Sequence, residues 1–233
     1  MCGRYSLTSA PEAIRQLFGY AETPNFPPRY NIAPTQPIAV VTTERGAQGP
    51  VRRFMLARWG FVPGFVKDPR DFPLIINARA ETVVDKASFR AAMKRRRCLV
   101  PADAYYEWLK LPAGGRILRK PYLFRRADGA PMGLAGVWET YAGADGAEID
   151  TACILTTGAS GATAAIHDRM PAIIEPKDFA RWLDCDETRV EEAAALLKPA
   201  ADDALEFFEI GPEINKATSE GAKLQEPLAP TLV

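Results

Sequence analysis

The feature that most constrains the fold of this chain is a succession of β-prone segments joined by short connections. We predict strands at residues 37–43, 51–59, 98–108, 121–126, 132–141, 151–157 and 205–210. A parallel pair of consecutive strands needs a crossover of a dozen or more residues, and most of these connections are shorter. We therefore expect a mainly antiparallel sheet that is partly closed into a barrel-like core.

Helical segments are few. We predict helices at residues 11–18, 85–97, 176–183 and 188–197, with Asp85 as the N-cap of the second and residues 94–97 as its basic last turn. Residues 23–37 and 60–73 have the composition of loops, and the tail after Gly211 is expected to be irregular. No internal repeat or long linker divides the chain. The prediction is one α+β domain over residues 1–233, with a mainly antiparallel, partly barrel-like β-sheet core and peripheral helices.

Charge and cysteine content restrict the classes of function. The 29 basic and 29 acidic side chains balance, so any nucleic-acid surface would have to be a local patch. Cys2, Cys98, Cys153 and Cys185 form no CxxC pair and the chain has one histidine, so we predict no metal and no cofactor. Wide cysteine spacing, no secretory signal and no long apolar stretch predict a soluble, cytoplasmic protein that does not enter the membrane.

A cysteine at position 2 offers chemistry that no internal cysteine has. Its small side chain invites removal of Met1, after which Cys2 would carry a free α-amine beside its thiol. Such a 1,2-aminothiol condenses with an aldehyde to a Schiff base, and the thiol then closes on the same carbon to form a thiazolidine. The amine has a reference pKa of about 8, so much of it is nucleophilic near neutrality. On these two residues alone, the simpler interpretation is that Met-Cys is only the way the chain starts.

Three polar sites could assist such a nucleophile. Asn77, Arg79 and Glu81 alternate after an apolar run and would share one face of an extended segment, although a solvated edge strand has the same pattern. Glu107 lies among aromatic residues, where a carboxylate is either paired with an arginine or raised in pKa for proton transfer. His167, the only histidine, is either structural or, as its loop setting favours, functional.

The chemistry of an aminothiol requires three kinds of assistance. A proton acceptor must keep the amine neutral, an acid must assist the loss of water, and a neutral dipole must orient the amine. His167, Glu107 and Asn77 could fill these roles, and the sequence does not say whether they lie together.

Six stretches of the chain combine into a specific pattern. They are residues 1–5 (MCGRY), 29–34 (RYNIAP), 59–60 (WG) with 63–64 (PG), 77–81 (NARAE), 98–103 (CLVPAD) with 106–108 (YEW), and 167–171 (HDRMP). In this order, over nearly the whole chain, they resemble the SOS response-associated peptidase (SRAP) family. One stretch alone would be a weak signal, whereas six in order, one of them fixed to the N-terminus, are highly specific.

The resemblance implies the SRAP fold and the covalent shielding of abasic sites in single-stranded DNA. An abasic deoxyribose opens to an aldehyde, which Cys2 would trap as a thiazolidine. By position in the motifs, Asn77 would orient the Cys2 amine. Glu107 would be the acid and base that promotes opening of the sugar ring, and His167 would serve the Schiff-base step or its reversal.

The resemblance also implies a set of DNA contacts, with two departures from the family pattern. The residues carried over are Arg4, Asn31, Pro34, Phe65, Arg79 and Arg169. The three arginines would hold phosphates that flank the lesion, and the asparagine and proline would help to shape the pocket. Family members often carry paired tryptophans where Phe65 and Val66 stand here; a single Phe can still stack on a base. Residues 219–221 (SEG) also differ, which we interpret as a structural difference.

The implied biological setting is the DNA damage (SOS) response. The family is credited with removing its own N-terminal methionine or a short propeptide, a step that the host aminopeptidase could equally perform here. We expect a monomer, and a Schiff base would make lyase chemistry available. Two other hypotheses remain open: a thiol peptidase or amidohydrolase with Cys2 as the N-terminal nucleophile, and a non-covalent reader of modified bases.

Overall fold

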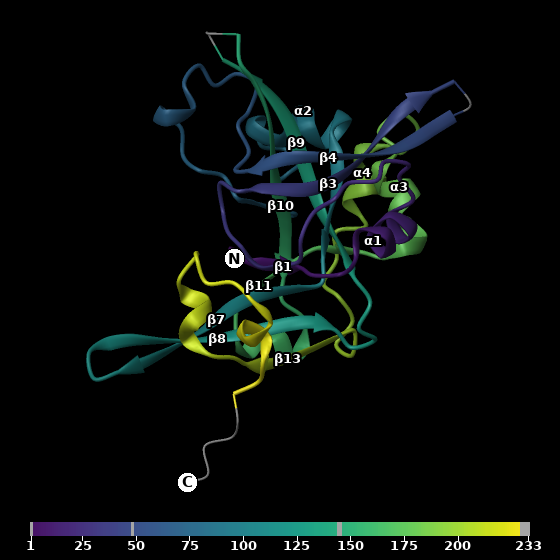
Figure 1. The fold of residues 1–233 in the computed structure, drawn as a ribbon. Helices are drawn as coiled ribbons and strands as arrows, with labels where there is room; N and C mark the ends of the chain where they lie inside the picture. The colour runs from purple at the N-terminus through teal and green to yellow at the C-terminus, as the bar shows by residue number, and fades with distance from the viewer. Residues whose placement is uncertain (1, 48, 144–145, 229–233) are drawn as a thin grey trace.

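The fold consists of two β-sheets with short helices around them (Figure 1). The computed structural model describes residues 2–47, 49–143 and 146–228. The first sheet has the order β13 (Leu205–Glu209), β8 (Arg116–Arg126), β7 (Ala104–Ala113), β1 (Tyr5–Leu7) and β2 (Arg29–Ile32). The second has the order β11 (Arg169–Pro171), β10 (Glu148–Gly158), β4 (Gly49–Trp59), β3 (Pro37–Gly46), β6 (Arg97–Ala102), β9 (Met132–Ala142) and β12 (Ile173–Ile174), with β5 (Asn77–Arg79) paired to β10.

The second sheet closes on itself. β9 pairs with β10 as well as with β6, so that β10, β4, β3, β6 and β9 form a small barrel. Most pairs are antiparallel, but β10 runs parallel to β4 and to β5. The predicted α+β class with a mainly antiparallel, partly barrel-like core is confirmed, with those two parallel pairs as the exception.

The helices cover the outside of this core. They are α1 (Pro11–Phe18), α2 (Ala87–Arg95), α3 (Phe179–Leu183) and α4 (Val190–Ala194). α1 has the predicted bounds, because Pro11 suits a first helical turn and Gly19 closes the helix in the left-handed region, with its N–H bonded to the Arg15 carbonyl. The last two helices are shorter than predicted. No helix in the described part of the chain is long and apolar enough to cross a membrane.

The predicted basic helix end at residues 94–97 is wrong at its last two residues, because α2 ends at Arg95. α2 starts after Lys86, not at Asp85, and Arg97 already belongs to β6. The Arg97 guanidinium is buried and donates to the carbonyl oxygens of Trp182 (2.6 Å) and Met93 (2.9 Å). This arginine therefore links β6 to α2 and α3 in the interior of the protein and does not form an exposed helix end.

The predicted single strand at residues 98–108 is two strands in different sheets. The chain bends at Asp103, whose carboxylate accepts backbone hydrogen bonds from Thr8 (2.5 Å) and Ser9 (2.7 Å). β6 therefore stays in the barrel, while β7 joins the first sheet and pairs with β1. This bend carries Glu107 from the barrel toward the N-terminus.

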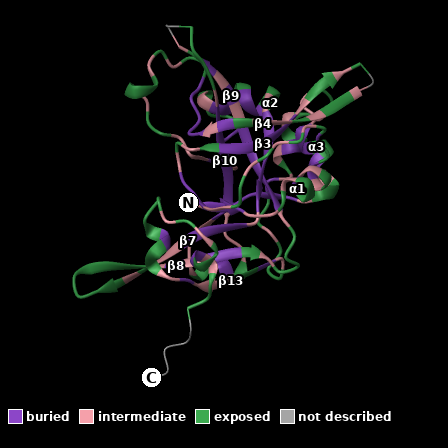
Figure 2. Ribbon diagram, in the orientation of Figure 1, coloured by how far each residue is buried: buried purple, intermediate pink, exposed green. Residues whose placement is uncertain are grey.

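Several strands were missed or were predicted too short, and the short β11 and β12 are among those missed. β1 and β2 were missed, the latter inside the predicted loop 23–37. β8 starts at Arg116, well before residue 121, because β7 and β8 form one long hairpin with Gly114 and Gly115 at its turn. Both glycines have positive φ values (54° and 79°), as a two-residue hairpin turn of type I′ requires. The buried strands cluster in the barrel and between the sheets, whereas the far end of this hairpin is exposed (Figure 2).

Candidate active site

Cys2 lies where the two sheets meet. It precedes β1, which pairs with β7 through Tyr5 and Tyr105, so the start of the described chain runs beside the segment that carries Glu107. The backbone N–H of Tyr106 donates to the Arg4 carbonyl (3.0 Å) and fixes this path. The Cys2 side chain is fully buried, and its Sγ donates to the same carbonyl at 3.7 Å.

Asn77 approaches Cys2 from the barrel side. β5 pairs in parallel with β10, which places Asn77 opposite Ile154 and Arg79 opposite Thr156. The Asn77 Nδ2 donates to the carbonyl oxygen of Cys2 at 2.8 Å. Its Oδ1 is buried and has no hydrogen-bond partner among the described residues, so it is available to accept a hydrogen bond.

Glu107 is a buried carboxylate that touches this region from the other sheet. Burial raises its pKa to about 7, so near neutrality both its acid and its base form are populated. Burial also raises the pKa of the Cys2 thiol, and the nearby Glu107 charge raises it further. The thiol is therefore held as a protonated group beside a carboxyl group that can exchange a proton.

His167 completes the cluster from the turn before β11. Its Nε2 lies 3.9 Å from Oε2 of Glu107. The backbone N–H of Arg169 donates to His167 Nδ1 at 3.0 Å, and the Asp168 Oδ1 lies at the same distance from that nitrogen. Because a backbone N–H can only donate, Nδ1 accepts the hydrogen bond from Arg169, and this contact favours the neutral ring with its proton on Nε2. Burial lowers the pKa of His167, which favours this neutral form.

The structure thus brings Cys2, Asn77, Glu107 and His167 together, although they come from both sheets. Such a set offers a nucleophile, an amide that can orient it and two groups for proton transfer. Among the described residues, no group of three or more His, Cys, Asp or Glu side chains is arranged to hold a metal ion.

The residues carried over as DNA contacts fall into different environments. The Arg4 guanidinium donates to Asn31 Oδ1 (2.7 Å) and to the Ile214 carbonyl (2.8 Å). Asn31 is fully buried, and its Nδ2 donates to the carbonyls of Lys216 and Ser219, both at 3.0 Å. These two residues hold the C-terminal segment against β1 and β2, while Pro34 is half-buried beside them.

The other two arginines differ in their pairing. Arg169 forms a bidentate ion pair with Glu81 (2.6 and 2.9 Å) and also donates to the Thr156 carbonyl (2.5 Å). Arg79 is exposed and has no ion pair among the described residues. The predicted common face of Asn77, Arg79 and Glu81 extends only over the strand Asn77–Arg79, because Glu81 lies in the turn after it.

Phe65 is 62% exposed on the loop after β4, and a second aromatic ring lies beside it. Phe72, from the far end of the same loop, packs edge-to-face on Phe65 with 6.2 Å between the ring centroids. A second aromatic ring therefore accompanies Phe65, although it comes from Phe72 and not from position 66. Phe72 could not be recognised from spacing, because the loop must fold back to present it.

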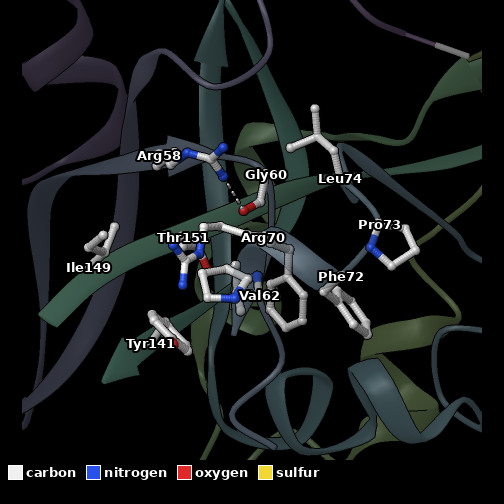
Figure 3. Close-up of a pocket in the computed structure, with 12 residues that line it drawn as sticks. Arg58, Gly60, Val62, Arg70, Phe72, Pro73, Leu74, Tyr141, Ile149 and Thr151 are labelled. Carbon is white, nitrogen blue, oxygen red and sulfur yellow. Dashed lines mark hydrogen bonds between the residues drawn. The ribbon is translucent and has the colours of Figure 1, made fainter. Parts of the chain in front are cut away.

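An apolar pocket of about 330 Å³ lies behind this loop (Figure 3). It is lined by Arg58, Gly60, Phe61, Val62, Pro69, Arg70, Phe72, Pro73, Leu74, Tyr141, Ile149 and Thr151. None of the four clustered residues lines it. The Tyr141 hydroxyl donates to the Lys67 carbonyl (2.8 Å) and the Val62 N–H donates to Thr151 Oγ1 (3.0 Å), so the loop is anchored to β9 and β10.

Comparisons with known proteins identify the family of this chain. The sequence profile of the family described as SOS response associated peptidase (SRAP) matches residues 1–217. The chain belongs to the SRAP family. It is 32% identical over 227 residues to the abasic site processing protein YoaM of Bacillus subtilis, covering 96% of this chain and 97% of that protein. It is 27% identical to the abasic site processing protein HMCES of Rattus norvegicus, covering 97% of this chain and 76% of that protein.

Solved structures extend the similarity to the fold. A protein from Bacteroides thetaiotaomicron superposes with a TM-score of 0.84 at 22% identity, covering 98% of this chain and all of that one. A phage-related protein from Bordetella bronchiseptica superposes with a TM-score of 0.73 at 27% identity, covering 91% of this chain and 95% of that one. The two-sheet architecture with its barrel is therefore shared with these solved structures.

Proposed function

We propose that this protein processes abasic sites in single-stranded DNA by covalent trapping through Cys2. Its SRAP relatives of similar length are named abasic site processing proteins. The observation that carries the proposal is the meeting of Cys2 with Asn77, Glu107 and His167 at the junction of the two sheets. Removal of Met1, which lies outside the described residues, is the condition for this chemistry.

The first step is attack by the Cys2 amine on the aldehyde of the ring-opened abasic sugar. The amine nitrogen bonds to the aldehyde carbon, and the resulting carbinolamine loses water to give a Schiff base. A carboxyl group with a pKa near 7 can donate the proton that the leaving hydroxyl needs, and Glu107 meets that requirement. The unpaired Oδ1 of Asn77 is suited to accept an N–H of the amine and so orient its lone pair.

The second step closes the ring. The Cys2 sulfur adds to the imine carbon, the thiol proton passes to the nitrogen, and a thiazolidine results, so that the net reaction releases one water. Burial keeps the thiol protonated until this stage, which favours attack by the amine before the sulfur. The same property counts against a thiol peptidase acting on external substrates, since such an enzyme needs a thiolate.

A trapping assay tests the proposal. Wild-type protein whose loss of Met1 is verified by intact mass is incubated with an oligonucleotide that carries one abasic site. We expect a denaturation-resistant adduct whose mass is the sum of the two components minus one water. Cys2→Ser should abolish it and leave at most a borohydride-trapped Schiff base, whereas Cys185→Ser, at a half-buried cysteine elsewhere, should trap normally. Absence of the adduct from the processed wild type would rule the proposal out.

The peptidase step implied by the family name is proposed to be removal of Met1 by the protein itself. Cys2→Ala distinguishes this from host processing, because alanine also suits the host aminopeptidase but lacks a thiol. Retention of Met1 in Cys2→Ala, measured by intact mass, supports self-processing, and its loss assigns the step to the host. Lyase activity is tested in the same trapping reactions by the appearance of cleaved strands.

A further inference from the structure

The β7–β8 hairpin extends beyond the first sheet as an arm (residues 109–120). It projects away from the rest of the molecule, to the left of β7 and β8 in the view of Figure 1. Residues 112–119 are all exposed, and the large apolar side chains of Ile117 and Leu118 are 66% and 49% exposed (Figure 2). Such an arm buries little of its own surface, so packing against the rest of the chain does not explain its length.

The arm is strongly basic. No Asp or Glu occurs between Glu107 and Asp128, while the arm contains Lys110, Arg116, Arg119 and Lys120. Lys120 pairs with Glu209 at 3.1 Å. For the other three cations no ion pair is formed within the described part of the chain. In a protein with balanced net charge, this is a local positive patch of the kind that a polyanion requires.

Two of these cations are placed directly opposite each other. Lys110 and Arg119 are cross-strand partners in the β7–β8 register. Like charges at such positions destabilise a hairpin, because their Cβ atoms are only about 5 Å apart. Trp108 is the neighbour of Lys110 on the same face of β7, because residues two apart on a strand point to the same side. Its indole N–H donates to Asn215 Oδ1 at 2.6 Å, which fixes the ring.

This face borders the segment that follows Cys2. Trp108 and Arg119 line an open groove of about 500 Å³ together with Gly3, Arg4, Pro34 and Asn215. The groove therefore runs from the residue next to Cys2 to the base of the arm. Burial is the main influence on the pKa values of Glu107 and His167, and the positive charge of Lys110 is a smaller one that lowers both. Lys110 is thus within electrostatic reach of the site.

We propose that Lys110 and Arg119 on this face of the arm bind backbone phosphates of the DNA strand where it leaves the active site. The inference rests on the proposed function for its substrate and adds a binding surface to it. A phosphate between the two cations would relieve their repulsion, and Trp108 supplies an aromatic surface beside the strand, a combination typical of single-strand binding. The unfavourable cation pair in the free protein is then the consequence of a site built for an anion.

The test measures non-covalent binding, so that it does not depend on crosslinking. The ligand is a single-stranded oligonucleotide with a central tetrahydrofuran abasic analogue, which has no aldehyde, and affinity is followed by fluorescence anisotropy over a series of salt concentrations. Lys110→Gln/Arg119→Gln should weaken binding on the order of tenfold at physiological salt and reduce the salt slope by about 2. The matched control is Lys177→Gln/Lys198→Gln, which removes the same charge from exposed lysines near α3 and α4.

A second measurement separates binding from folding. Because the arm variant loses a like-charge pair, its melting temperature should be equal to or higher than that of the wild type, whereas a structural role would lower it. Equal affinity and equal salt slope in the arm variant and the wild type would overturn the inference. If the wild type binds this DNA through the arm yet forms no adduct with a true abasic site, the arm stands and the proposed function fails. If the wild type crosslinks normally and the arm variant binds as tightly as the wild type, the proposed function stands and the inference about the arm fails.

Discussion

Glu107 and His167 face each other across the candidate active site, with 3.9 Å between Oε2 of the glutamate and Nε2 of the histidine. The Arg169 backbone N–H occupies the other ring nitrogen, so the proton of the neutral imidazole points toward the carboxylate. Burial moves the two pKa values in opposite directions, upward for Glu107 and downward for His167. Near neutrality Glu107 is therefore the member of the pair that gains and loses a proton, while the His167 ring stays neutral.

Replacing Glu107 with glutamine should alter both stability and rate. The pKa of Glu107 is raised from 4.5 to about 7 on folding, so between these values the folded state keeps a proton that the unfolded state has lost. The free energy of unfolding should fall as pH rises through this window, by up to about 3 kcal/mol. Glu107→Gln should remove that fall and slow adduct formation. Urea denaturation at a series of pH values checks this, with Glu226→Gln as the exposed control; an unchanged pH profile would contradict it.

The state of His167 can be measured directly, because it is the only histidine. Since burial lowers its pKa, the ring should titrate below its usual value and be neutral at pH 7. The neutral ring should carry its proton on Nε2. Long-range proton–nitrogen NMR spectra of the imidazole report both properties. A proton on Nδ1, or a pKa above that of a free histidine, would exclude the arrangement described for this site.

The outline of the fold follows from local sequence signals. α1 was predictable to the residue because proline and glycine mark its two ends, and the strands of the barrel carry β-branched runs. The bend at Asp103 was not predictable, because the residues on both sides of Asp103 are apolar and the bend depends on hydrogen bonds from Thr8 and Ser9, far away in sequence. The arm was missed because its exposed strands have no buried face to produce an alternating pattern.

The candidate site could be predicted as a set of residues but not as an arrangement. Asn77, Glu107 and His167 each stood out by chemical type in an unusual setting. Their meeting depends on β5 and β11 both pairing with β10, and on β7 pairing with β1 in the other sheet. Long-range strand pairing of this kind leaves no local trace. The same limit hid the Glu81–Arg169 ion pair, because only the fold brings the two segments together.

Asn77 should be more sensitive to replacement by aspartate than by alanine. Its Nδ2 donates to the Cys2 carbonyl at 2.8 Å, and alanine merely removes that hydrogen bond, worth about 1 kcal/mol. Aspartate would place a carboxylate against the same carbonyl and add a negative charge beside Glu107. We expect slower adduct formation in Asn77→Ala and a further loss in Asn77→Asp, measured at saturating abasic DNA. The opposite order would show that Asn77 does not act as a donor to Cys2.

Arg79 and Arg169 lie on the barrel side, and two neutral substitutions test whether each contacts DNA: one replaces Arg79, and the other replaces Glu81, the ion-pair partner of Arg169. Arg79 has no ion pair among the described residues, so Arg79→Gln should weaken binding of single-stranded DNA and lower the salt slope by about 1. Glu81 holds the Arg169 guanidinium and has a pKa lowered by that contact. Glu81→Gln should free the guanidinium and strengthen binding if Arg169 contacts phosphate. Anisotropy with the tetrahydrofuran oligonucleotide measures both, and weaker binding by Glu81→Gln would assign Arg169 a structural role.

Phe65 and Phe72 should contribute unequally to DNA binding. Phe65 is 62% exposed and can stack on a base, an interaction worth about 1–3 kcal/mol, whereas Phe72 is half-buried and supports the Phe65 ring edge-on. Phe65→Ala should therefore weaken binding by at least about fivefold, and Phe72→Ala by less, without changing the salt slope, because neither carries charge. Leu74→Ala, at a 51% exposed residue that follows Phe72 on the same loop, is the apolar control. Equal effects of Phe65→Ala and Leu74→Ala on affinity would indicate general loop packing in place of stacking, since only an aromatic ring offers a face to a base.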